Sequence, residues 1–155
     1  MQPAASKQLD LFPFSPLVEE ISPAPEAVAV FRRMCSLPHC LFLDSALRHD
    51  TLGRYSFVTA DPFDFVTVSA DTEPADDEQP LATLERWLAT FRADAALGLP
   101  PFQGGAAGLF GYELGRGLQR LPKPRFDEFQ TPALAVGLYD VVVAFDHQTD
   151  RAWII

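Results

Sequence analysis

Two short segments of this 155-residue chain carry side chains that could bind a small polar molecule. The first is Asp44-Ser45, and the second, one short loop later, is Gly53-Arg54-Tyr55. A carboxylate can hold an ammonium group, while a guanidinium and backbone N–H groups can hold a carboxylate, so the set suits an amino acid. The alternative is that Arg54 and Asp44 simply pair with each other. The residues alone leave both interpretations open.

The stretch PFQGGAAGLFGYELGR, residues 101–116, is rich in glycine and raises the question of a phosphate-binding loop. A dinucleotide-binding loop requires G-x-G-x-x-G, but alanine follows Gly104 two positions later, and a P-loop requires a lysine that is not present here. Glycines also permit a close approach of neighbouring backbone. We therefore expect a closely packed strand over residues 105–112, with Leu109 and Phe110 filling core space.

Patterns for metal binding or nucleophilic catalysis are not evident in the sequence. The histidines lie in three separate segments without ligand spacing, so we expect loop or surface histidines. They are His39, His49 and His147. No G-x-S-x-G occurs, and Ser45 has no flanking glycines. Cys35 and Cys40 do not form a C-x-x-C pair, and we expect both to stay reduced as small apolar residues.

Charge and composition narrow the class of protein. The chain has 12 basic and 21 acidic residues and no block of lysine or arginine, which argues against nucleic acid or an anionic membrane as a partner. Neither an apolar signal-peptide region nor a run of about 20 apolar residues occurs, so we expect a cytoplasmic protein. The chain ends in RAWII, inside a predicted strand, which predicts the N-terminal piece of a longer protein.

The hydrophobic pattern predicts an α+β fold with a largely antiparallel β-sheet and two main helices. One helix opens at Ser22 or Pro23, stops at Pro38 and has one apolar face, formed by Ala27, Val30, Phe31 and Met34. The second helix spans residues 81–98, between a solvated loop over 71–80 and the glycine-rich stretch. Further strands are expected over residues 40–46, 55–60 and 63–70. After a connection over 121–132, the chain ends in a hairpin, with one strand up to about Phe145, a turn over 146–150 and a return strand.

Three stretches together resemble one family. LDSA at 43–46 followed by GRYSF at 53–57 resembles the N-terminal motif of the chorismate-utilising anthranilate synthase component I family. Residues 101–116 resemble the Gly-Gly-x-x-Gly-x-x-x-Tyr-Glu/Asp signature of the same region. Their PFQGG start and LFGY core, and the later AVGLYDVVVAFDHQ, look like the para-aminobenzoate branch of this family, aminodeoxychorismate synthase component I. The likeness covers the chain from about Leu37 to His147.

The resemblance implies that residues 1–155 form an N-terminal, non-catalytic domain. The chorismate-binding domain, with the catalytic residues and the Mg²⁺ ligands, would lie outside this chain, so no cofactor is expected here. The complete protein would aminate chorismate to 4-amino-4-deoxychorismate, using ammonia from a glutamine amidotransferase subunit. The glycine-rich strand would lie at the sheet centre, near the junction with the catalytic domain. One alternative is anthranilate synthase component I, and another is a free-standing amino-acid-binding regulatory domain.

The family's N-terminal region also holds a tryptophan pocket, so L-tryptophan is a possible ligand. The positions of this sequence that match the motif are Asp44, Ser45, Leu52, Gly53, Arg54 and Tyr55. Asp44 stands where the tryptophan-sensitive enzymes typically have Glu. Its side chain is one methylene shorter, which argues against tight binding of tryptophan.

Overall fold

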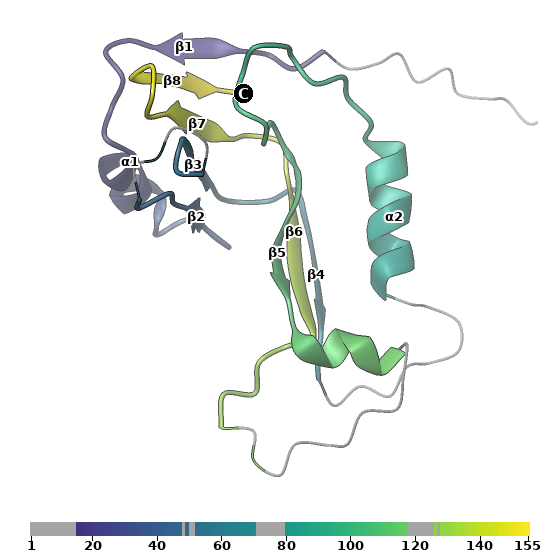
Figure 1. The fold of residues 1–155 in the computed structure, drawn as a ribbon. Helices are drawn as coiled ribbons and strands as arrows, with labels where there is room; N and C mark the ends of the chain where they lie inside the picture. Colours follow the sequence, from purple (N-terminus) through teal and green to yellow (C-terminus); the bar gives the residue numbers. More distant parts are fainter. Residues whose placement is uncertain (1–14, 48, 50–51, 71–79, 118–125, 127) are drawn as a thin grey trace, which may run out of the picture.

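The computed structural model describes residues 15–47, 49, 52–70, 80–117, 126 and 128–155, and half of the predicted connection over 121–132 lies outside this part (Figure 1). Its strands form two antiparallel sheets, in the orders β1-β8-β7-β3-β2 and β4-β6-β5, which together with the helices confirms the predicted α+β class. In chain order the elements are β1 (Glu19–Ile21), α1 (Ala27–Met34), β2 (Leu41–Leu43), β3 (Tyr55–Thr59), β4 (Asp64–Val68), α2 (Pro80–Thr90), β5 (Gly105–Phe110), the 3₁₀ helix η1 (Tyr112–Gly117), β6 (Leu134–Tyr139), β7 (Val143–Asp146) and β8 (Arg151–Ile154).

One long, bent strand pair joins the two sheets. β3 pairs with β7 in the five-stranded sheet, and β4 pairs with β6 in the other, so the segment β3–β4 runs alongside β6–β7. At the bend, residues 59–63 lie opposite residues 139–142, so the first segment carries one residue more, as in a β-bulge. Asp61 there has a φ of 54°, and Thr59 Oγ1 donates a hydrogen bond to the carbonyl of Val141 at 2.7 Å.

The predicted C-terminal hairpin is correct at its tip and wrong in its first strand. β7 and β8 pair across the predicted turn, with Asp146 opposite Arg151. The strand expected to run up to Phe145 is in fact two strands, β6 and β7, which belong to different sheets. Both strands are largely buried, and only Asp140 and Val141 between them are exposed, so a brief interruption of the apolar pattern is the one sequence mark of the bend.

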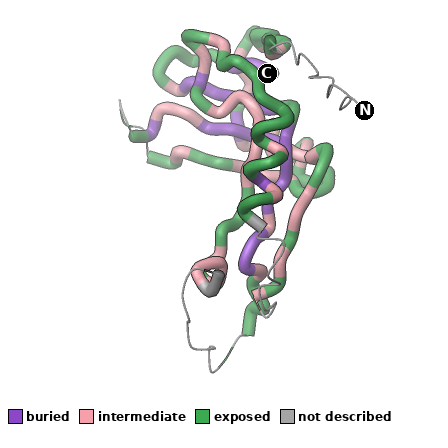
Figure 2. Tube along the Cα trace, turned by 90° about the vertical axis from the view of Figure 1, so that its right-hand side faces the viewer, coloured by how far each residue is buried: buried purple, intermediate pink, exposed green. Residues whose placement is uncertain are grey.

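α1 packs on one face of the five-stranded sheet, as its apolar stripe predicts. Ala27 is buried with Val58 and Phe145, and the other three residues of the stripe are partly buried against the same cluster. The opposite face of the sheet carries Phe57 and Trp153, and the chain segment that follows α2 packs against it. Figure 2 shows that the buried positions concentrate in the strands of the two sheets.

α2 lies along the three-stranded sheet (Figure 1) and contributes Leu84 to that core. It ends at Thr90, so the prediction of a helix up to Gly98 is wrong. The physical reason is a loop that is held together by the Gln103 side chain. Its amide accepts a hydrogen bond from Ala96 N–H at 2.8 Å and donates to the Ala96 carbonyl at 2.9 Å, which replaces helical hydrogen bonds. No helix in the described ranges is long and apolar enough to cross a membrane.

The glycine-rich stretch forms β5, and the structure answers the question that its composition raises. A Cβ at Gly108 would overlap the carbonyl oxygen of Ala135 and lie 2.8 Å from Val136 Cα, which confirms the close backbone approach. β5 is nevertheless an edge strand, not a central one. Leu109 and Phe110 are 42% and 54% exposed, so the expectation that they fill the core is wrong. The sheet beside them ends at β5, and no further strand covers their side in the described residues.

Candidate functional site

The two predicted site segments meet at one end of the β2–β3 pair. Leu43, the last residue of β2, lies opposite Phe57 of β3. The chain therefore leaves β2 through Asp44 and Ser45 beside the start of β3, where Arg54 enters. Asp44 is exposed and Ser45 half-buried.

Ser56 connects this end of the sheet to the β7–β8 hairpin. Its hydroxyl is fully buried and donates a hydrogen bond to Asp44 Oδ1 at 2.8 Å. The same oxygen accepts the Ser45 N–H at 3.2 Å and lies 2.7 Å from His147 Nε2. Four residues from three segments of the chain thus share one hydroxyl group.

The direction of these hydrogen bonds follows from the single proton that a serine hydroxyl can donate. Ser56 has one proton, and an ionised Asp44 can only accept it. The oxygen then accepts from Ser45 and from His147, so His147 carries a proton on Nε2, as the neutral Nε2–H tautomer or as imidazolium. Ser56 therefore links His147 and Asp44 through its hydroxyl group.

These three side chains do not form a hydrolytic triad. In a triad the histidine accepts the serine proton, and the carboxylate orients the histidine. Here the carboxylate contacts Ser56, and His147 donates to it. Ser56 is also fully buried, out of reach of a substrate carbonyl. The arrangement fixes the loop after β2 and performs no acyl transfer.

Arg54 pairs with Asp146, not with Asp44. Its Nε donates to Asp146 Oδ1 at 3.0 Å and its Nη2 to Oδ2 at 2.6 Å, a bidentate pair between the residue before β3 and the last residue of β7. The hydrogen bonds from the Arg54 guanidinium lower the pKa of the Asp146 carboxyl to about 2, and the Gln148 N–H adds to this effect. The guanidinium also lies 4.8 Å from the centre of the Tyr55 ring. The idea that Arg54 and Asp44 form an ion pair is therefore wrong.

The remaining predicted residues shape the loop. Leu52 is 84% exposed, and its N–H donates to His49 Nδ1 at 3.3 Å. Gly53 is buried, and a Cβ there would overlap the carbonyl oxygen of Leu47, so the loop can close only over a glycine. Tyr55 packs beside Phe57 on the face of the five-stranded sheet that is opposite to α1.

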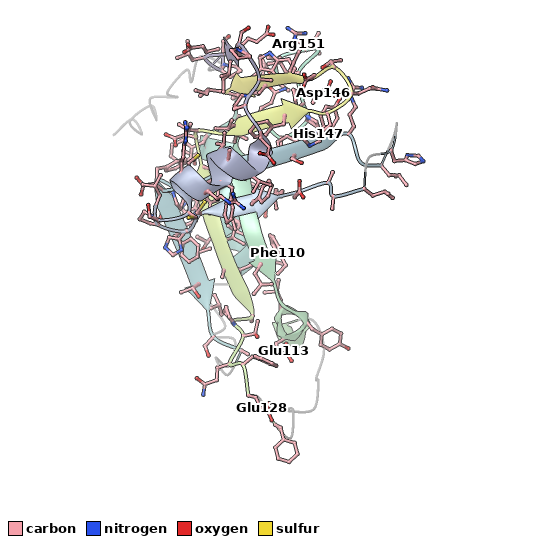
Figure 3. All side chains as sticks on the ribbon, turned by 90° about the vertical axis from the view of Figure 1, so that its left-hand side faces the viewer. Phe110, Glu113, Glu128, Asp146, His147 and Arg151 are labelled. Atoms are coloured by element: carbon pink, nitrogen blue, oxygen red, sulfur yellow. The ribbon has the colours of Figure 1, made fainter. Side chains whose placement is uncertain are left out.

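A cavity of about 290 Å³ lies on the α1 side of the β7–β8 hairpin. It is lined by residues 24–27 at the start of α1, by 145–147 and by Asp150 and Arg151. Figure 3 labels three of these residues, Asp146, His147 and Arg151, which lie close together at the hairpin end. None of the six predicted site residues lines this cavity.

Sequence reasoning missed three residues of this site, namely Ser56, Asp146 and His147. Ser56 is part of the GRYSF stretch, and the other two lie in AVGLYDVVVAFDHQ. All three residues therefore lie inside the motifs that carry the family resemblance. The expectation of a loop or surface histidine holds for His147, which lies in the turn after β7, although its side chain is half-buried. His39 is exposed, but its ring stacks on the ring of Phe65, with 3.7 Å between the ring centres.

Metal-ligand groups and reactive thiols are sparse in the described ranges. They contain no group of three or more His, Cys, Asp or Glu side chains that could hold a metal ion. Cys35 and Cys40 are free thiols, and burial raises the pKa of the Cys40 thiol above its ordinary value.

Comparison with known proteins confirms the resemblance. Aminodeoxychorismate synthase component 1 of Escherichia coli is 36% identical over 128 residues, which cover 76% of this chain and 28% of that protein. The Salmonella typhimurium protein of the same name is 33% identical over 147 residues, or 86% of this chain and 32% of that protein. Anthranilate synthase component 1 of Acetivibrio thermocellus is 27% identical over 137 residues, 83% of this chain and 28% of its own length. No family model matches the chain.

Proposed function

We propose that this chain is the N-terminal, non-catalytic domain of an aminodeoxychorismate synthase component I. The complete protein would aminate chorismate to 4-amino-4-deoxychorismate in the cytoplasm. Ammonia would come from a glutamine amidotransferase subunit, and Mg²⁺ would bind in the chorismate-binding domain. The observation that carries this proposal is the 36% identity to the Escherichia coli protein. The "component 1" in the relatives' names supports a partner component.

The packing of the three motif stretches supports a scaffold role. GRYSF contacts AVGLYDVVVAFDHQ through Ser56 and His147. It contacts PFQGG through Phe57 and Phe102, whose rings meet edge to face at 5.7 Å. The motifs therefore build one folded unit.

The function is tested on the complete reading frame, extended past Ile155. The protein receives chorismate, Mg²⁺ and ammonia, and the product is identified by mass and by conversion to para-aminobenzoate with added lyase. We expect aminodeoxychorismate. Anthranilate would move the protein to the tryptophan branch, in which the Acetivibrio thermocellus relative is 27% identical. A reading frame that stops after Ile155, or no turnover, would favour the free-standing binding domain.

We further propose that Asp44 is the ammonium-binding group of an amino-acid site. Ser56 holds Asp44 Oδ1, while within the described part of the chain Oδ2 has no hydrogen-bond partner. Arg54 is engaged by Asp146, so the ligand's carboxylate would need other donors. The site would therefore favour the ammonium end of the ligand.

Calorimetric titration with L-tryptophan tests this site. Asp44→Asn removes the charge but keeps an acceptor for Ser56, and we expect it to weaken binding at least tenfold. Asp64→Asn, on β4, is the control and should bind as the unaltered chain does. Equal affinity of the Asp44 variant would remove Asp44 from the site, and no binding by the unaltered chain would remove tryptophan as its ligand.

A further inference from the structure

The four edges of the two sheets differ in how well they are protected. Natural proteins protect exposed edges with short strands, charged side chains or proline, because an open edge recruits other strands. β1 and β2 each have three residues, and β1 carries Glu19 and Glu20. β4 begins with a charged residue, Asp64, and Pro62 lies two positions before it.

β5 has none of these devices. It is six residues long, with the sequence GAAGLF, and contains no charge and no proline. One edge pairs with β6 along its whole length, from Gly105 opposite Tyr139 to Phe110 opposite Leu134. In the part of the chain that the structure describes, no strand pairs with its other edge.

The side chains at the end of β5 add apolar surface on both sides of this edge. Leu109 and Phe110 are neighbours in an extended strand, so they point to opposite faces of the sheet. Both are more than two-fifths exposed, and Tyr112, two positions after Phe110, is exposed as well. In Figure 3 the Phe110 side chain stands beyond the ribbon of the sheet. An edge of this kind on an isolated domain is prone to self-association.

We infer that the free edge of β5 pairs with a β-strand from the part of a longer synthase that this chain does not contain. The inference rests on the proposed function. The similar synthases are longer than this chain, which spans 28% of the Escherichia coli protein and 32% of the Salmonella typhimurium protein. The partner strand is extended and uncharged, with bulky side chains beside Ala106 and Ala107, where β5 leaves room.

A second copy of this chain is the less favourable occupant. Each copy carries a formal net charge of -9, and two such chains repel each other.

Hydrogen–deuterium exchange of the β5 amides that point away from β6 tests the inference, because the alternate amides of Gly105–Phe110 already pair with β6. It is measured in the 155-residue chain and in the complete protein extended past Ile155. We expect fast exchange in the short chain and exchange slower by about 100-fold in the complete protein, because strand pairing protects amides. Phe110→Lys in the complete protein should restore fast exchange. Leu97→Lys, at a position that is 97% exposed in a loop, should not.

The outcomes separate this inference from the proposed function. Fast exchange in a complete protein that still makes aminodeoxychorismate would refute the strand pairing and leave the function intact. Protection that appears in the short chain as its concentration rises would assign the edge to a second copy and refute the inferred occupant. A reading frame that ends at Ile155 would refute both proposals, and sequencing alone would show it.

Discussion

Replacing Asp146 with Asn removes the charge from the buried end of the ion pair with Arg54. The Asp146 side chain is 5% exposed and the Arg54 side chain 35%. Asn keeps nearly the same size but can accept only one of the two guanidinium hydrogen bonds. The variant therefore tests the ion pair with little change in packing volume.

The size of the effect follows from the pKa of the Asp146 carboxyl. This pKa falls from 3.8 to about 2, and a shift of that size corresponds to about 2 kcal/mol of stability at neutral pH. Because the folded-state pKa is depressed, the contribution is present above the unfolded pKa of 3.8. It is lost as the pH falls from there toward 2. We expect Asp146→Asn to lower the free energy of unfolding by about 2 kcal/mol at pH 7.

Urea unfolding at pH 7 and at pH 2.5 measures this effect. The Arg151–Glu20 pair provides the control, since its distances of 2.9 and 2.6 Å nearly match those of the buried pair. Its side chains are 50% and 46% exposed, and exposed pairs contribute little, so Glu20→Gln should cause no resolvable change. Equal destabilisation by both variants would refute the role of burial. A deficit of Asp146→Asn that persists undiminished at pH 2.5 would show that packing, not charge, accounts for it.

Three further predictions concern the hydrogen bonds and close contacts of the fold. Gly108→Val should lower the melting temperature strongly, whereas Gly98→Val, with a positive φ but open space around it, should lower it less. Equal losses would contradict the crowding argument. Ser56→Ala should cost about 1–3 kcal/mol in urea unfolding, because it leaves buried partners unsatisfied, while Thr90→Ala on the α2 surface should cost little. Gln103→Ala should speed amide exchange at Ala96, and unchanged exchange there would deny the side chain its role.

A periodic apolar pattern in the sequence predicts an element well when that element packs against a single surface. The α1 stripe works because a single sheet face covers it. α2 is harder, since Leu88 and Phe91 continue the apolar pattern although both are largely exposed. The helical pattern therefore extends past the helix, and the loop that ends it depends on Gln103, whose role no helix pattern reveals.

The site shows the same limit. The convergence of Asp44 and Ser45 with the start of β3 could be predicted, because a short loop joins the two strands. The partner of Arg54 could not, since Asp146 lies 92 residues away and only the pairing of β3 with β7 places it there. Asp44 is much closer to Arg54 along the chain, which is why the sequence suggests it as an alternative partner. The pairing of β3 with β7 instead brings the distant Asp146 carboxylate to Arg54.

The positions of the motif residues also indicate which property of the protein the family resemblance reflects. Gly53, Arg54 and Ser56 are used within the fold: Gly53 lets the loop close, Arg54 pairs with Asp146, and Ser56 joins Asp44 to His147. A scaffold of this kind suits any enzyme that places its catalytic residues elsewhere, which agrees with matches to both aminodeoxychorismate and anthranilate synthases. On the proposed function, we expect these motifs to build the fold and the choice of product to be made in another part of the complete protein. For this reason, product analysis of the complete reading frame discriminates between the two branches, and substitutions in GRYSF should alter stability before they alter the product.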